Sequence, residues 1–125
     1  MLDLNNLKEG DTYKINVLGT EYTIIFSIDN ETYPWLDCSN GYEDTSTKEI
    51  VIKYKPEDAD NSVQNYTNIV KKNIRHEVIH AFLDESGLAF DTAKALSWAI
   101  NEEMVDWFAI QWPKISKVFI ELGVI

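Results

Sequence analysis

Residues 63–86 read VQNYTNIVKKNIRHEVIHAFLDES, and this stretch decides the fold that the rest of the chain builds on. Its apolar residues recur at intervals of three and four, which places them in one stripe along a helix. The stripe consists of Val63, Tyr66, Ile69, Val70, Ile74, Val78, Ala81 and Phe82. Gly87 follows where a left-handed residue commonly ends a helix. The pattern therefore predicts one amphipathic helix over about residues 63–86.

The predicted helix carries both histidines of the chain, in the pentapeptide His76-Glu77-Val78-Ile79-His80. Residues four apart share a helix face, with about 5–6 Å between their Cβ atoms, so both imidazoles can reach one metal ion. A catalytic zinc site needs three protein ligands and one open position. Glu77 lies about 100° around the helix from His76, where it can take a proton from the ion's water. Two polar residues on a helix surface are the alternative, but the spacing of the only two histidines favours a metal site.

On the N-terminal side of this helix the apolar pattern changes to a period of two. Residues 13–17 alternate, residues 18–20 suit a turn, and residues 22–28 are rich in β-branched and aromatic side chains, which predicts a hairpin. Residues 29–47 are polar and loop-like, and residues 48–54 form a third predicted strand. We therefore expect a small three-stranded antiparallel sheet before the helix.

Two further helices are predicted on the C-terminal side. The first begins near Asp91 or Thr92 and ends at Pro113, because proline removes a backbone donor. A short third helix follows over residues 114–122. Three strands followed by three helices predict an α+β fold with the helices on one face of the sheet, in a single domain over residues 1–125.

The hexapeptide Asn101-Glu102-Glu103-Met104-Val105-Asp106 on the predicted second helix offers a third metal ligand. Glu102 lies far enough after His80 for one reversal and an antiparallel return, and we favour it as the ligand, with Glu103 next. Asp106, one turn further on, could accept the remaining ring N–H of a liganding histidine. These carboxylates could instead be solvated. However, Glu102 and Asp106 share a stripe that we expect to be buried, and a buried carboxylate needs a partner. The other members of that stripe are Ala95, Trp98, Ala99 and Ala109.

The sequence HEVIH, followed on a later helix by NEEMVD, resembles the His-Glu-x-x-His plus Asn-Glu-x-x-x-Asp pattern of gluzincin zinc metallopeptidases. Residues 102–109 also resemble the third-ligand helix of the small ImmA/IrrE-type peptidases, many of which are carried by phages and mobile elements. The match covers about residues 71–109. The preceding strands fit the family's minimal zincin-like fold by their order only.

The resemblance implies a zinc metalloendopeptidase that hydrolyses peptide bonds, of a kind that can be regulatory. His76, His80 and Glu102 would bind Zn²⁺, and Glu77 would act as general base on the metal's water. Asp106 would support a liganding histidine. The ImmA-like group often has Asn at this position, so Asp106 agrees better with the wider gluzincin pattern.

Neither an oxyanion donor nor a substrate-binding surface is identified by the sequence. Both histidines are already assigned, and the candidate hydroxyl donors Tyr42, Tyr54 and Tyr66 are each better explained by packing. Residues 50–54 could offer a strand edge to an extended peptide, although a plain structural strand is an equal alternative.

Composition limits the partners of the protein. A net charge of -10, with Arg75 as the single arginine, argues against a nucleic-acid surface. Cys38 is the only cysteine, which excludes an intrachain disulfide, and no apolar run has membrane-spanning length. We expect a cytoplasmic protein with a peptide or protein substrate. Alternatives are a zinc-stabilised interaction module without catalysis and a metal-free protein with a coincidental motif, although the presence of Glu77 favours catalysis over a structural zinc site.

Overall fold

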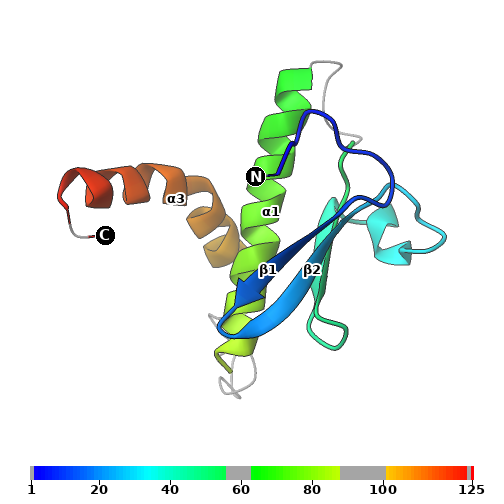
Figure 1. Cartoon of the computed structure of the whole chain (residues 1–125), viewed down its shortest axis with the longest axis horizontal. Coiled ribbons are helices and arrows are strands. Elements are labelled where there is room, and N and C mark those ends of the chain that lie inside the picture. Colours follow the sequence, from blue (N-terminus) through cyan, green and yellow to red (C-terminus); the bar gives the residue numbers. More distant parts are fainter. Residues whose placement is uncertain (1, 56–62, 88–100, 124) are drawn as a thin grey trace.

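The computed structural model of the protein describes residues 2–55, 63–87, 101–123 and 125. These residues form an α+β structure with a four-stranded mixed sheet and two long helices. The central helix α1 spans Val63–Glu85, and helix α3 spans Glu102–Glu121. Figure 1 shows the sheet on one side of α1 and α3 on the other, so α1 is the middle layer of the described structure.

The predicted hairpin is confirmed. Strand β1 (Thr12–Val17) pairs antiparallel with strand β2 (Thr20–Phe26). The two residues between the strands, Leu18 and Gly19, have φ angles of 51° and 92°. Two positive φ angles in a two-residue loop match the right-handed twist of the flanking strands, which explains the tight reversal.

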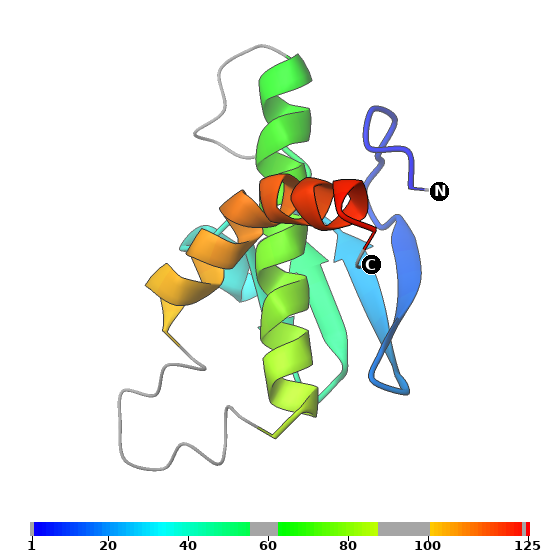
Figure 2. The same ribbon diagram turned by 90° about the vertical axis from the view of Figure 1, so that its left-hand side faces the viewer.

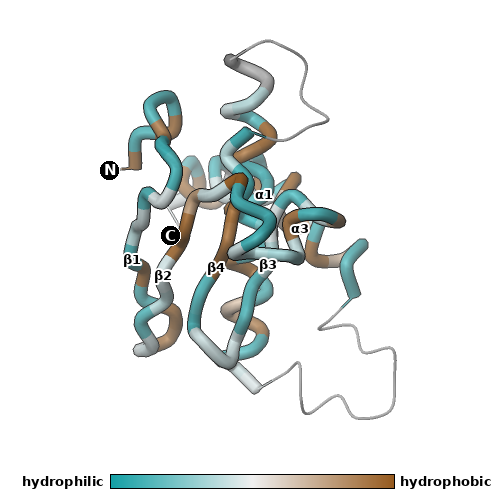
Figure 3. The backbone as a smooth tube through the Cα atoms, turned by 90° about the vertical axis from the view of Figure 1, so that its right-hand side faces the viewer, coloured by the Kyte–Doolittle hydropathy of each residue, from teal (hydrophilic) through white to brown (hydrophobic). Residues whose placement is uncertain are grey.

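The predicted antiparallel three-stranded sheet is wrong in two respects. Strand β4 (Glu49–Ile52) pairs parallel with β2, and an unpredicted strand β3 (Gly41–Asp44) pairs antiparallel with β4. The strand order is β1-β2-β4-β3, as Figure 3 shows. Strand β3 was missed because its sequence, GYED, lacks the β-branched alternation that marks a strand.

The parallel pairing follows from the connection between β2 and β4. This segment crosses back to the start of β2 and contains the 3-10 helix η1 (Pro34–Asp37) and β3. Parallel strands require such a long crossover, whereas a short turn would have produced an antiparallel pair. Strand β4 is thereby an inner strand, and its consecutive residues Ile50, Val51 and Ile52 are all buried.

The hydrophobic core lies between the sheet and α1. Its buried members are Val17, Tyr22, Ile24, Phe26, Ile50, Ile52, Val70 and Ala81. The predicted stripe of α1 supplies Val70 and Ala81, with Ile74 and Val78 partly buried beside them. Gly87 ends the helix as predicted, with φ of 81° and its N–H donating to the Asp84 carbonyl. Helix α1 therefore presents one side to the sheet and leaves the other side for α3.

Helix α3 contradicts the predicted break at Pro113. The helix continues through this proline, so the predicted third helix over residues 114–122 is the second half of α3. Proline removes one donor and bends a helix, but flanking turns can keep the helical path, and Figure 1 shows α3 changing direction. Asn101 caps the described start of α3 by accepting the Met104 N–H at 2.9 Å. The predicted helix start at residues 91–92 lies outside the described residues.

Neither described helix, α1 or α3, is long and apolar enough to cross a membrane.

Candidate metal centre

Three predicted ligands converge where the N-terminal turn of α3 meets α1. The Nε2 atoms of His76 and His80 lie 3.2 Å apart. The carboxylate of Glu102 faces both rings, with Oε2 2.8 Å from Nε2 of His76 and Oε1 3.0 Å from Nε2 of His80. Among the described residues, these three form the one group of at least three histidine, cysteine or acidic side chains whose ligand atoms lie within 4.8 Å of one another.

The spacing of these atoms suits a shared cation. Tetrahedral coordination with bonds of about 2 Å puts ligand atoms roughly 3.3 Å apart, close to the 3.2 Å between the two Nε2 atoms, and the Glu102 carboxylate offers one oxygen to each ring. Two imidazole nitrogens and one carboxylate oxygen are ligands that first-row divalent metals accept. These three side chains are therefore a group that could hold a metal ion.

Asp106 lies behind His76. Its Oδ1 accepts a hydrogen bond from Nδ1 of His76 at 3.2 Å and lies 3.3 Å from Nζ of Lys72. Burial opposes ionisation of Asp106, but the positive charge of Lys72 and the hydrogen bonds from Lys72 and His76 lower its pKa. A proton held on Nδ1 leaves the Nε2 lone pair of His76 directed at the shared site.

Glu77 is buried beside the three ligands. One of its carboxylate oxygens lies 4.0 Å from Nε2 of His76. Burial raises the pKa of Glu77 to about 7, against an opposing effect from His76 and with a further rise from the charge of Glu102. A carboxyl group with a pKa near neutrality can both accept and return a proton at physiological pH.

Gly41 of β3 packs closely against strand β4 beside Glu77. A Cβ atom at this position would lie 3.5 Å from Cγ of Glu77 and only 3.1 Å from both the Val51 carbonyl and the side chain of Ile52. A larger residue would therefore require the Ile52 side chain or the Val51 carbonyl of β4 to shift. Sequence reasoning did not single out this glycine, because residues 41–44 were expected to lie in a loop.

A cleft of about 340 Å³ opens beside Glu77 between β3 and the two helices. It is lined by Ser39, Gly41, Tyr42, Glu43, Glu77, His80 and Glu102. Tyr42 is the one candidate tyrosine in this lining, whereas Tyr54 packs against the core and Tyr66 lies on α1. The predicted use of residues 50–54 as a free edge is wrong, because β4 lies between β2 and β3. The edge strand next to the cleft is β3.

Glu43 is a feature of the cleft that the sequence did not reveal. Burial raises its pKa to about 8, with further contributions from a hydrogen bond with Asp84 and from the charges of Asp84 and Glu77. Its buried Oε1 atom finds no hydrogen-bond partner among the described residues. Glu43 and Asp84 are far apart in sequence, so only the packing of β3 on α1 brings them together.

The expected burial of Glu102 is wrong, although its proximity to the histidines is as expected. The Glu102 side chain is 71% exposed, and the buried residues of α3 are Val105 and Ala109. Glu102 opens the helix at the rim of the contact with α1, so its carboxylate reaches the site from the solvent side. Glu103 is exposed and lines a separate pocket beside Trp107. The remaining stripe residues at positions 95, 98 and 99 lie outside the described residues.

Comparison of the chain with models of known protein families, with curated proteins and with solved structures found no match. The resemblance to gluzincin metallopeptidases consequently depends on the two sequence motifs. The convergence of His76, His80 and Glu102 is a structural observation, separate from the motif match.

Proposed function

We propose that the protein is a zinc-dependent peptidase of the gluzincin type with a minimal zincin-like fold. The observation that carries the proposal is the convergence of His76, His80 and Glu102 beside the buried carboxyl group of Glu77. A zinc site that only stabilised the fold would usually be closed by four protein ligands, whereas these three would leave one position for water beside Glu77. The substrate class is a peptide or protein.

Zinc, when bound by these three residues, would lower the pKa of a coordinated water towards about 7 and polarise a peptide carbonyl. Glu77 would accept a proton from the attacking water and return it to the leaving amine. Asp106 would hold the proton on Nδ1 of His76 throughout, which keeps that ring in the ligating tautomer.

The edge position of β3 favours the binding of a substrate peptide in an extended conformation. An unpaired strand edge can form backbone hydrogen bonds with a peptide and does not require a particular sequence. The cleft beside β3 carries the carboxyl groups of Glu43, Glu77 and Glu102, and the pKa values of the first two are raised to about 8 and about 7. Tyr42 is the candidate hydroxyl donor for the oxyanion because it lines the same cleft.

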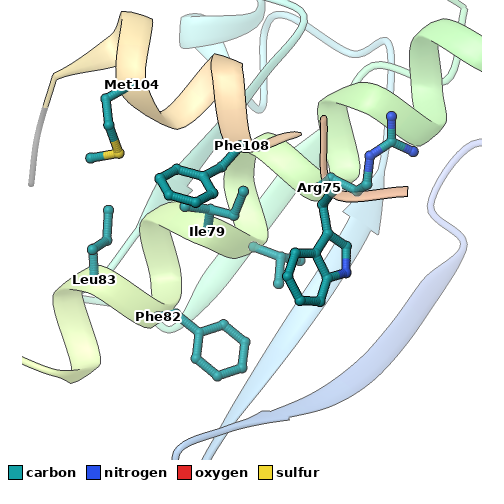
Figure 4. Close-up of a pocket in the computed structure, with 8 residues that line it drawn as sticks. Arg75, Ile79, Phe82, Leu83, Met104 and Phe108 are labelled. Carbon is teal, nitrogen blue, oxygen red and sulfur yellow. The ribbon is translucent and has the colours of Figure 1, made fainter. Parts of the chain in front are cut away.

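A zinc-stabilised interaction module without catalytic activity is the second candidate, and a specific surface favours it. An apolar pocket of about 650 Å³ lies between α1 and α3 on the side away from the cleft lining, with Arg75 at one end and Met104 at the other (Figure 4). Trp107 and Trp112 on α3 are 53% and 46% exposed. Such apolar surface is typical of an interaction site.

The two candidates are separated by Glu77→Gln, compared with wild type on a peptide library while the zinc content of both samples is measured. We expect Glu77→Gln to keep its zinc and to lose cleavage by about 10²–10⁴-fold, the usual contribution of a general base. Glu103→Gln is the matched control on an exposed carboxylate, and it should cleave as wild type does.

Equal cleavage by wild type and Glu77→Gln would show that Glu77 is not the base. Stoichiometric zinc with no cleavage by either protein would favour the binding module. A wild-type protein with well under one equivalent of zinc after gentle purification would exclude both zinc-dependent functions.

A further inference from the structure

Pro113 leaves one backbone carbonyl of α3 without its usual helical hydrogen-bond donor. In a helix, each carbonyl accepts the N–H of the residue four positions later, and for Ala109 that residue is Pro113. Proline has no N–H, so the Ala109 carbonyl cannot receive its usual helical bond. Ala109 is also fully buried, which denies this carbonyl a replacement partner from bulk water. A buried carbonyl in this position requires a donor from elsewhere.

Arg75 of α1 supplies that donor. Its Nε–H donates to the carbonyl oxygen of Ala109. The guanidinium group is always charged and carries its donors on a rigid plane, so it can reach a buried acceptor without losing its charge. Arg75 also lines the apolar pocket with Phe108 and Trp112, and such low-polarity walls strengthen a hydrogen bond beside them (Figure 4).

The bond completes a row of contacts between the two helices. Glu102, Asp106 and Ala109 lie four and three positions apart, so they share one side of α3. Glu102 meets His76 and His80, Asp106 meets Lys72 and His76, and Ala109 meets Arg75. The last of these contacts is the one that involves no candidate ligand and no carboxylate.

We propose that Arg75 is a positioning residue, which replaces the donor that Pro113 withholds from Ala109 and thereby fixes α3 so that Glu102 meets the histidines. The hydrogen-bond part of this inference is independent of metal. The ligand part depends on the proposed metal site. Arg75 of α1 thus supplies the hydrogen bond that Pro113 cannot donate within α3.

The hydrogen-bond part is tested by a double-mutant cycle in metal-free protein, with urea unfolding of wild type, Arg75→Met, Pro113→Ala and the double variant. Arg75→Met should raise the unfolding equilibrium constant about tenfold or more in the wild-type background, because a buried carbonyl loses its donor. Pro113→Ala restores an N–H in α3. In that background Arg75→Met should change the constant by less than about threefold.

Lys71→Met is the matched control, since it removes one positive charge from an exposed position of α1. Its effect should be small and equal in both backgrounds. Arg75→Gln, which keeps an N–H donor, should lose less stability than Arg75→Met. If Arg75→Met does not fold, the double variant decides: its folding would support the inference, and its failure to fold would overturn it. An effect of the Arg75 substitution that is the same with Pro113 as with Ala at position 113 would overturn the inference.

The ligand part is tested by zinc affinity, measured by chelator competition on the same four proteins. Arg75→Met should weaken zinc binding about tenfold, in the range for groups that orient a ligand, and Pro113→Ala should largely restore it. Coupled stability with unchanged zinc affinity would overturn the positioning of Glu102. If wild type binds no zinc, the proposed function fails, while the unfolding cycle still decides whether Arg75 replaces the missing donor.

Discussion

The two sides of α1 are stabilised by different interactions. The side facing the sheet buries Val70 and Ala81 among the strands, whereas the side facing α3 meets it through Lys72, His76 and His80. Figure 2 shows α3 lying across α1 on the side opposite the sheet. Apolar burial is not directional, but hydrogen bonds and ion pairs depend on orientation. The sheet side should therefore contribute more to stability, and the α3 side should determine the geometry of the site.

The largest difference between the two sides is expected in stability. Ile50→Ala creates a cavity in the fully buried core and should lower the free energy of unfolding by about 2–5 kcal/mol. Ile110→Ala removes the same atoms from a residue of α3 that is 43% exposed, and should change stability by less than about 0.5 kcal/mol. Urea unfolding of both variants measures the difference. Equal losses would mean that α3 contributes to the core as much as the sheet does.

Metal affinity, unlike stability, should depend more on the side of α1 that faces α3 than on the side that faces the sheet. Glu102→Ala removes a proposed ligand and should weaken zinc binding by more than about a hundredfold, beyond the range usual for a group that only orients a ligand, such as Asp106. Glu103→Ala changes the neighbouring carboxylate, which lines another pocket, and should have little effect. Competition with a chromogenic chelator gives both affinities. The reverse order would reassign the third ligand to Glu103.

Substitution of Tyr42 tests whether β3 supplies a catalytic hydroxyl group in addition to its backbone pairing in the sheet. Tyr42→Phe removes only the hydroxyl group and should lower kcat by about a hundredfold if that group stabilises the oxyanion. Tyr54→Phe and Tyr66→Phe are the matched controls, because neither residue lines the cleft. Zinc content should be unchanged in all three variants. A larger loss in either control would transfer the role to that residue.

The smallest expected effect concerns the end of α1. The carboxylate of Glu85 accepts hydrogen bonds from Lys48, from Thr20 at 2.9 Å and from Tyr22 at 2.9 Å, and these bonds lower its pKa below 4.5. A lowered pKa in the folded state means that the stabilisation is present above pH 4.5 and is lost as the pH falls through the folded-state value.

Glu85→Gln should therefore be less stable than wild type at pH 7, and the difference should shrink below pH 4.5. Urea midpoints measured across this pH range provide the check. Glu21→Gln, at an exposed ion pair with Lys14, is the control and should show a weaker dependence. A difference between wild type and Glu85→Gln that stayed constant down to pH 3 would contradict the assignment.

Features that depend on local sequence were predicted well. The bounds of α1, its end at Gly87 and the hairpin around Leu18 and Gly19 follow from periodicity and turn chemistry within a few residues. The strand β3 and the parallel pairing of β4 could not be predicted in this way. Their stability comes from neighbours far along the chain, and a short polar strand carries little propensity of its own.

The path of α3 at Pro113 is a second feature that local sequence rules could not predict. Local rules predict a break at a proline because a donor is lost, and that expectation takes no account of a donor on another element. Arg75 supplies one from α1, beside the contacts that Glu102 and Asp106 make. The continuity of α3 therefore reflects a tertiary contact in addition to the preferences of its own residues.

The sequence by itself determined the α+β class, the central helix and the placement of His76, Glu77 and His80 on it, because helical periodicity fixes which side chains share a face. Only the tertiary structure decided which carboxylate reaches the histidines, that β3 lies at the cleft, and that burial raises the pKa of Glu77 to about 7. These properties depend on distances between segments remote in sequence, and such distances are set by packing.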